Sequence, residues 1–238
     1  NYYFDINTKI KNLFTNEEKH YLLNHPTIKV HNESNWPPFN FNIDNTPKGF
    51  SIDYMNLIAS KIGISVEYIS GFTWKEYLEK LKNNEIDVML NIAKTNEREN
   101  HFSFTSPYIH SVDIVYVREG TNNFKKLSDF NGKKMAVIRG FYEEELLKQK
   151  YPNIKLLSVE NSLAGLKKVA FGEADGFIDD FAVANYFITN NLISNLKAAF
   201  EVKDEEFNLD LAMATNKENE ILRNILEKGK DLITEEEL

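Results

Sequence analysis

The stretch IDYMNLIASKIGISVEYISGFTWKEYLEKLKNNEIDVML, residues 52–90, decides the fold class. Its first part repeats apolar side chains at helical spacing, and Gly63 then favours the left-handed turn that ends a helix. A strand at 65–69 and a second helix follow, and the stretch ends in a buried strand at 87–90. With a strand at 28–31 the order is β-α-β-α-β, which predicts a mainly parallel sheet with right-handed crossovers.

A second alternating unit follows in the sequence. It begins after a long alternating strand at 111–118. The expected strands are 134–138, 154–159 and 176–178, and the expected helices are 142–150, one ending at Gly172, and 181–189. The tail adds expected strands at 198–202 and 209–214 and a helix at 220–228. Two strands and a helix are too little for a domain, so the tail must complete an earlier one.

This pattern predicts an α/β chain with two lobes, each a mainly parallel sheet flanked by helices. We expect the first lobe to comprise residues 27–112 plus 204–238, with the second lobe, 113–203, inserted into it. Two strands that cross between the lobes would then form the hinge. Residues 1–26 are polar, carry one short helix signal at 16–24, and are expected to be a leader or linker.

The composition narrows the function classes. Apolar residues make up 42% of the 238, which is enough for a packed core, and the net charge is −8. Nucleic-acid binding needs clustered Lys and Arg, so no nucleic acid is expected as a partner. Cysteine is absent, which rules out disulfides and thiolate metal sites. No apolar run is long enough to cross a bilayer, and the start at Asn1 suggests a piece trimmed from a longer chain.

Candidate binding residues follow the ends of strands in the first lobe, where open α/β sheets bind ligands. Trp36 and Trp74, the only tryptophans, could sandwich an apolar or cationic group, although both also suit a core position. Arg98 follows the strand at 87–90. Its planar guanidinium suits a carboxylate, whereas the alternative is an ordinary surface arginine.

The second lobe offers fewer candidates. Gly140 precedes a helix whose free amides could hold an anion. Asp180 follows a strand and either caps the next helix or faces a ligand ammonium. The histidines lack metal-ligand spacing, no nucleophile elbow is present, and adjacent Asp179 and Asp180 form a poor acid–base pair. We therefore expect no catalytic residue, no metal and no cofactor.

One motif resembles a known family. Thr95-x-x-Arg98, followed by the FTSPY of residues 104–108, is similar to the TxxR…F(S/T)xPY motif of family 3 bacterial extracellular solute-binding proteins. The family's order of motifs also continues through WPPF, GFSID and GxAD, at residues 36–39, 49–53 and 172–175. The resemblance implies a type II periplasmic-binding-protein fold, also called a Venus flytrap.

The ends of the chain resemble a subgroup of that family. The leader LFTNEEK at 13–19 and the tail from Ile221 to Glu236 are similar to segments that flank the periplasmic sensor domains of hybrid histidine kinases. This implies a periplasmic sensor domain whose membrane-anchored signalling modules belong to the same polypeptide. The alternative is a free receptor that delivers its solute to an ABC permease. A third is a dehydratase on the same fold, with Glu33 as its acid–base group.

The resemblance also implies roles at the site. Arg98 would pair with a ligand carboxylate and Asp180 with its ammonium, so that the solute bridges the two lobes and favours their closure. The side chain of the solute would lie between Trp36 and Trp74. Glu33 and Asn91 would also face the cleft.

Two positions depart from the family pattern. Ala93 and Phe141, which follows Gly140, stand where a hydroxyl usually binds the carboxylate. The expected ligand is therefore an amino acid or a related small carboxylate, with an amine left open.

Overall fold

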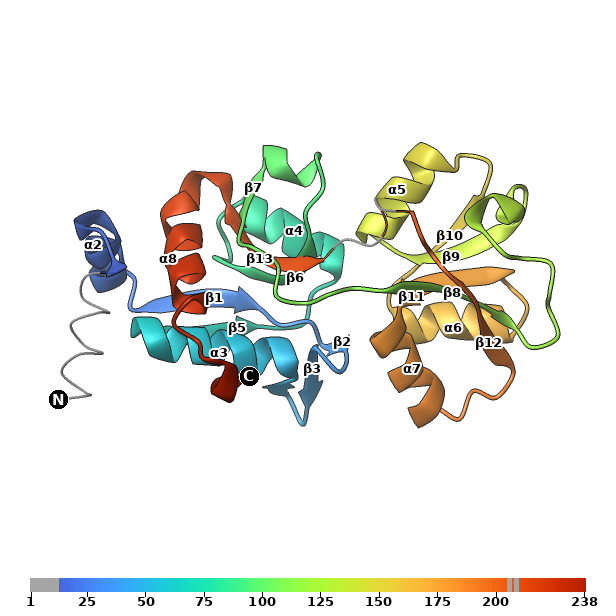
Figure 1. The fold of residues 1–238 in the computed structure, drawn as a ribbon, viewed down its shortest axis with the longest axis horizontal. Coiled ribbons are helices and arrows are strands. Elements are labelled where there is room, and N and C mark those ends of the chain that lie inside the picture. The colour runs from blue at the N-terminus through green and yellow to red at the C-terminus, as the bar shows by residue number, and fades with distance from the viewer. Residues whose placement is uncertain (1–12, 205–206, 208–209) are drawn as a thin grey trace.

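A computed structural model describes residues 13–204, 207 and 210–238. Two lobes lie side by side along the long axis of the molecule (Figure 1). The first lobe contains the strands β1–β7 and β13, and the second contains β8–β12. The prediction of a two-lobed α/β fold is confirmed. The predicted lobe boundaries, at residues 112/113 and 203/204, stay a prediction.

The first lobe is built on two small sheets joined at one point. β1 (Thr27–His31) runs parallel to β5 (Ser65–Ile69), and Val30 also bridges Val88, which leads into β6 (Met89–Ala93). β13 (Leu211–Asn216) lies antiparallel between β6 and β7 (Phe102–Phe104). The helices of this lobe are α3 (Phe50–Ile62), α4 (Trp74–Lys82) and α8 (Glu220–Lys230).

The second lobe has one five-stranded sheet, in the order β10-β9-β11-β8-β12. The strands are β8 (Asp113–Arg118), β9 (Lys134–Ile138), β10 (Lys155–Val159), β11 (Gly176–Asp180) and β12 (Leu196–Glu201). The helices are α5 (Tyr142–Lys150), α6 (Ser162–Ala170) and α7 (Phe181–Asn190). β10, β9 and β11 are parallel neighbours, as predicted, whereas β8 is antiparallel to both β11 and β12.

The expectation of mainly parallel sheets therefore needs a correction, because the sheets are mixed. In the five-stranded sheet of the second lobe β8 runs against its hydrogen-bonded neighbours, and in the β6-β13-β7 sheet of the first lobe β13 does so. Both are the first strands after the chain passes from one lobe to the other. A strand that enters a lobe from the interlobe side points away from the gap, whereas the carboxyl ends of the others point toward it. The hydrophobic pattern of a strand does not encode this direction.

Several elements begin and end where the sequence predicts. The leader helix α2 (Asn16–Asn24) and α5 have the predicted bounds, and Gly63 adopts the left-handed conformation, with φ 77°, at the end of α3. α2 packs on α8, where Glu18 forms a salt bridge of 2.7 Å with Lys228. The first twelve residues of the expected leader, and Leu209 of an expected strand, lie outside the described residues.

The sequence prediction missed β7 and a small antiparallel sheet near the gap between the lobes. This sheet consists of β2 (Asn35–Trp36), β3 (Asn40–Ile43) and β4 (Thr46–Lys48). Its strands are short, polar and interrupted by prolines, so they lack the alternation that identifies a strand. The sheet carries Trp36, which packs within the apolar core cluster of the second lobe.

Among the described residues, no helix has both the length and the hydropathy that crossing a membrane requires.

Candidate functional site

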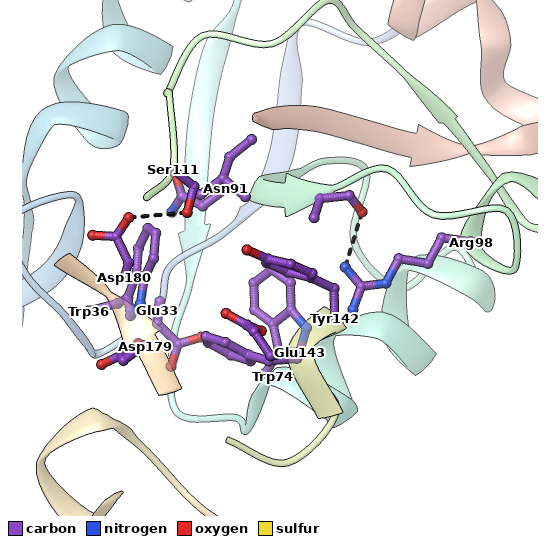
Figure 2. Close-up of a pocket in the computed structure, with 13 residues that line it drawn as sticks. Glu33, Trp36, Trp74, Asn91, Arg98, Ser111, Tyr142, Glu143, Asp179 and Asp180 are labelled. Atoms are coloured by element: carbon purple, nitrogen blue, oxygen red, sulfur yellow. Dashed lines mark hydrogen bonds between the residues drawn. The ribbon is translucent and has the colours of Figure 1, made fainter. Parts of the chain in front are cut away.

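A cavity lies between the two lobes, and Figure 2 shows the side chains around it. It offers about 20 Å³ to the centre of a water-sized sphere, which is room for about one water molecule in this arrangement of the lobes. Its lining residues are Glu33, Trp36, Trp74, Asn91, Ala93, Arg98, Ser111, Phe141, Tyr142, Glu143, Asp179, Asp180 and Leu211. Every predicted site residue except Gly140 lines it.

The two tryptophans come from different elements of the first lobe. Trp36 lies in β2 after the loop that carries Glu33, and its ring packs on Phe39 with centroids 5.0 Å apart. Trp74 is the first residue of α4, whose start is fixed by a capping box of Thr73 and Glu76. Both rings are largely buried and also line the cavity. The core interpretation is therefore confirmed for both rings, and their contact with a ligand stays a prediction.

Aromatic contact across the gap brings the lobes together beside the cavity. The Trp74 ring meets Phe141 of the second lobe edge-on, with centroids 5.1 Å apart. Gly140 precedes Phe141 with φ 78°, a left-handed conformation that favours glycine. A Cβ atom at Gly140 would lie 3.5 Å from the Cβ atom of Lys75. Gly140 thus shapes the contact between the lobes without lining the cavity.

Asn91 lies in the cavity wall, and two hydroxyl groups hold its side-chain oxygen in place. Its Oδ1 atom accepts hydrogen bonds from the hydroxyls of Ser51 and, at 2.8 Å, Tyr108. Asn91 has φ 57°, a left-handed conformation that asparagine tolerates better than most residues. Its Nδ2 atom has no partner among the described residues and is free to donate to a solute.

Arg98 is buried, with 4% of its surface exposed, so the alternative of a surface arginine is wrong. Its Nη1 atom donates to the Ala93 carbonyl at 3.1 Å. Its Nη2 atom crosses the gap and donates to the Gly140 carbonyl at 3.0 Å and to Glu145 Oε1 at 3.1 Å. Arg98 thus already holds a carboxylate of the second lobe, and only its Nε atom lacks a partner among the described residues.

Asp180 accepts three hydrogen bonds within the protein. Its Oδ1 atom accepts the backbone N–H groups of Ala182 and Val183 at 2.8 and 3.2 Å, so the alternative that it caps the next helix is confirmed. Its Oδ2 atom accepts the Ser111 hydroxyl at 3.1 Å. A carboxylate can accept about four hydrogen bonds, so Asp180 can cap α7 and bind a solute at the same time.

Sequence reasoning missed five lining residues: Ser111, Tyr142, Glu143, Asp179 and Leu211. Glu143 looked like one of three ordinary first-turn acids of α5. Asp179 neighbours a predicted site residue, but alternation along a strand favours opposite directions for adjacent side chains. The end of β11 lies at the gap, and there both side chains reach the cavity wall.

The second lobe places several carboxyl groups in a dry environment. Burial raises the pKa of Asp113 to about 8, and it also raises the pKa values of Glu143, Asp179 and Asp180. Asp113 lies opposite Asp180 in the sheet, and the two charges disfavour each other. A positive charge in the cavity would stabilise the ionised form of these carboxyl groups.

The sequence model for bacterial extracellular solute-binding proteins, family 3, matches residues 28–238. The virulence sensor protein BvgS of Bordetella pertussis is 25% identical over 228 residues, which cover 94% of this chain and 18% of that protein. The chain thus spans less than a fifth of this relative. A "Probable histidine-binding protein" of Campylobacter jejuni is 27% identical over 226 residues, with 94% and 85% covered.

Solved structures show the same fold. The periplasmic VFT2 domain of Bordetella pertussis BvgS superposes with a TM-score of 0.82 at 24% identity, covering 94% of this chain and 95% of that domain. These matches confirm the family and the fold that the TxxR and FTSPY motifs predict. The matching family is one of solute-binding proteins, and the match gives no support to Glu33 as a dehydratase group. The chain belongs to the bacterial extracellular solute-binding proteins, family 3.

Proposed function

We propose that this domain closes on a small solute and serves as the periplasmic sensor part of a membrane receptor. The observation that carries the proposal is the cavity between the lobes, lined by side chains from both. Its volume admits about one water molecule, so a larger solute can enter only when the lobes separate. The solute is then enclosed when they come together again.

The sensor role is supported by the BvgS relative, which is named as a sensor protein and extends far beyond the matched part. In such a receptor the partners are membrane-anchored signalling modules of the same polypeptide. The second candidate is a free receptor for an ABC permease. It is supported by the histidine-binding relative, of which the matched residues cover 85%. The full-length gene separates the two, because kinase modules after residue 238 exclude the importer.

Closure in this proposal is a population shift. The first lobe, residues 27–112 plus 204–238, contributes Glu33, Trp36, Trp74 and Asn91, and the inserted lobe contributes Asp180. A solute that contacts both lobes binds only the closed form and so raises its population. Raising the ratio of closed to open 100-fold takes about 2.8 kcal/mol of differential affinity. Two or three charge-assisted contacts with buried rings supply an energy of that size.

A distance measurement across the gap tests closure. Asn96 of the first lobe and Gln149 of the second line one shallow pocket, and the chain has no cysteine, so Asn96→Cys and Gln149→Cys can be labelled selectively. When a solute binds, we expect the distribution of distances between the two labels to become narrower and to shift to shorter distances. Trp36 and Trp74, the only tryptophans, report binding independently through fluorescence.

A matched control carries both labels within the second lobe, at Gln149 and Glu173, where closure changes nothing. A solute that alters tryptophan fluorescence but leaves the Asn96–Gln149 distances unchanged would contradict closure.

A further inference from the structure

The cavity has an excess of acidic side chains. Four carboxyl groups line it, and we call them the acidic lining: Glu33, Glu143, Asp179 and Asp180. Arg98 is the only lysine or arginine among the described residues that line the cavity. A solute with a net positive charge is therefore favoured over a neutral or negative one.

Arg98 does not balance this charge. Its guanidinium is paired with Glu145, which does not line the cavity, and with two backbone carbonyls. Figure 2 shows Arg98 at the opposite end of the group from Asp179 and Asp180. A solute carboxylate would have to displace Glu145 before it could accept two parallel hydrogen bonds from Arg98.

The acidic lining also has acceptor atoms without donors. Glu143 and Asp179 are 5% and 1% exposed, yet Glu143 Oε2 and Asp179 Oδ2 accept no hydrogen bond within the described part of the chain. Glu33 Oε2 forms no hydrogen bond of normal length either, although it lies 3.5 Å from Nε2 of the buried His31. Buried carboxylate oxygens are almost always hydrogen-bonded, and an ammonium group brings three donors.

The rest of the lining suits the same solute. Trp36, Trp74 and Phe141 provide aromatic surface, on which a cation gains about 0.5–2 kcal/mol. The Trp36, Trp74 and Asn91 N–H groups lack partners among the described residues, and they suit an oxygen acceptor of the solute or a water molecule. In the part of the chain that the structure describes, no three His, Cys, Asp or Glu side chains are placed to hold a metal ion. The cation is thus organic.

We infer that this site takes a small organic cation without a carboxylate, an amine whose ammonium group pairs with the acidic lining. This rests on the proposed function, because the amine must enter while the lobes are apart. It departs from the amino-acid expectation, which depends on a free Arg98. An amine that fills the gap contacts acids of both lobes, Glu33 in the first and Glu143, Asp179 and Asp180 in the second, and so favours closure.

Matched pairs of compounds test the inference, since the members of each pair differ only by the carboxylate. Titration calorimetry would compare agmatine with arginine, 1,4-diaminobutane with ornithine, and histamine with histidine. We expect at least one amine to bind ten times or more tightly than its parent amino acid. A parent that binds as tightly as its amine, or a panel in which no amine binds, would overturn the inference.

Isosteric variants locate the ammonium. Glu143→Gln and Asp179→Asn each remove a carboxyl group that a bound ammonium would ionise, and we expect each to weaken binding of the best amine by roughly 10- to 100-fold. Glu67→Gln, an exposed acid on β5 outside the cavity, is the matched control and should leave the affinity unchanged. Equal affinities for all three variants would place the amine elsewhere and contradict the inference.

The labelled Asn96/Gln149 protein separates this inference from the proposed function. An amino acid that binds and closes the lobes refutes the amine assignment and leaves the closure proposal standing. An amine that binds without changing the label distances supports the amine assignment and refutes the closure proposal.

Discussion

Replacing Arg98 with Ala is expected to open the gap between the lobes. The guanidinium forms two bonds across the gap, to the Gly140 carbonyl and to Glu145, and both disappear in the variant. Glu145 is partly exposed, so its ion pair is discounted for solvent screening. The two bonds together stabilise the closed form by about 2–4 kcal/mol, so its population relative to the open form should fall by roughly 30- to 700-fold.

The measurement is the Asn96–Gln149 label distance in the absence of any solute, supported by the radius of gyration from small-angle scattering. The circular dichroism spectrum should stay that of a folded protein, because the apolar cores of the lobes do not depend on Arg98. Arg223→Ala is the matched control, since that arginine pairs with Glu220 within α8. Label distances that match the parent protein would show that the Arg98 bonds do not hold the lobes together.

Glu145→Gln refines the result. The glutamine can still accept one hydrogen bond from Arg98 but carries no charge, so we expect an intermediate opening. If Arg98 instead serves a solute carboxylate, Glu145→Gln should strengthen amino-acid binding, because the competing carboxylate is gone. The same two variants therefore report on the lobes and on the solute.

The fold was predictable from the sequence because its signals are local. Gly63, and the capping box of Thr73 and Glu76, are formed by neighbouring residues, and both act in the structure as they do in any helix. The TxxR motif likewise placed Arg98 beside the cavity, although an isolated arginine gives no such signal.

The partners of the site residues were not predictable, because they depend on how distant segments meet. Glu145 lies 47 positions from Arg98, and nothing in either segment marks the pair. Glu143 and Glu145 share the first turn of α5, yet one faces the cavity and the other faces Arg98. Three acidic residues at the start of a helix are already accounted for by the helix dipole. The sequence therefore provides no reason to expect that one of them belongs to the acidic lining.

Asp113 makes the stability of the domain depend on pH. Its side chain is fully buried, and its Oδ2 atom and the Phe207 carbonyl both lie within hydrogen-bond distance of the Tyr142 hydroxyl. The Tyr142 hydroxyl has one proton to donate to these two oxygens, so it compensates the burial of the Asp113 carboxylate only in part. This agrees with a pKa raised by burial to about 8. The titratable groups around Asp113 are Tyr142 and Glu143 of α5 and Asp179 and Asp180 of β11.

The direction of the pH effect follows from linkage. The folded state keeps the proton on Asp113 up to about pH 8, whereas the unfolded state releases it near its ordinary value of 3.8. Between these values the folded state binds more protons, so the free energy of unfolding falls as the pH rises. At about 1.4 kcal/mol per pH unit, the loss between pH 5 and pH 8 is about 4 kcal/mol. Glu143, Asp179 and Asp180, whose pKa values are also raised, add to the loss.

We therefore expect the melting temperature without solute to fall by roughly 8–16 °C from pH 5 to pH 8. Asp113→Asn keeps the shape of the side chain and removes its titration, so its melting temperature should vary less with pH. Glu67→Gln should retain the slope of the parent protein. If an amine occupies the acidic lining, its charge lowers the pKa values of these carboxyls, and saturating agmatine should flatten the parent's slope as well. Identical slopes for the parent and Asp113→Asn would exclude Asp113 as the source, because no other group changes between the two proteins.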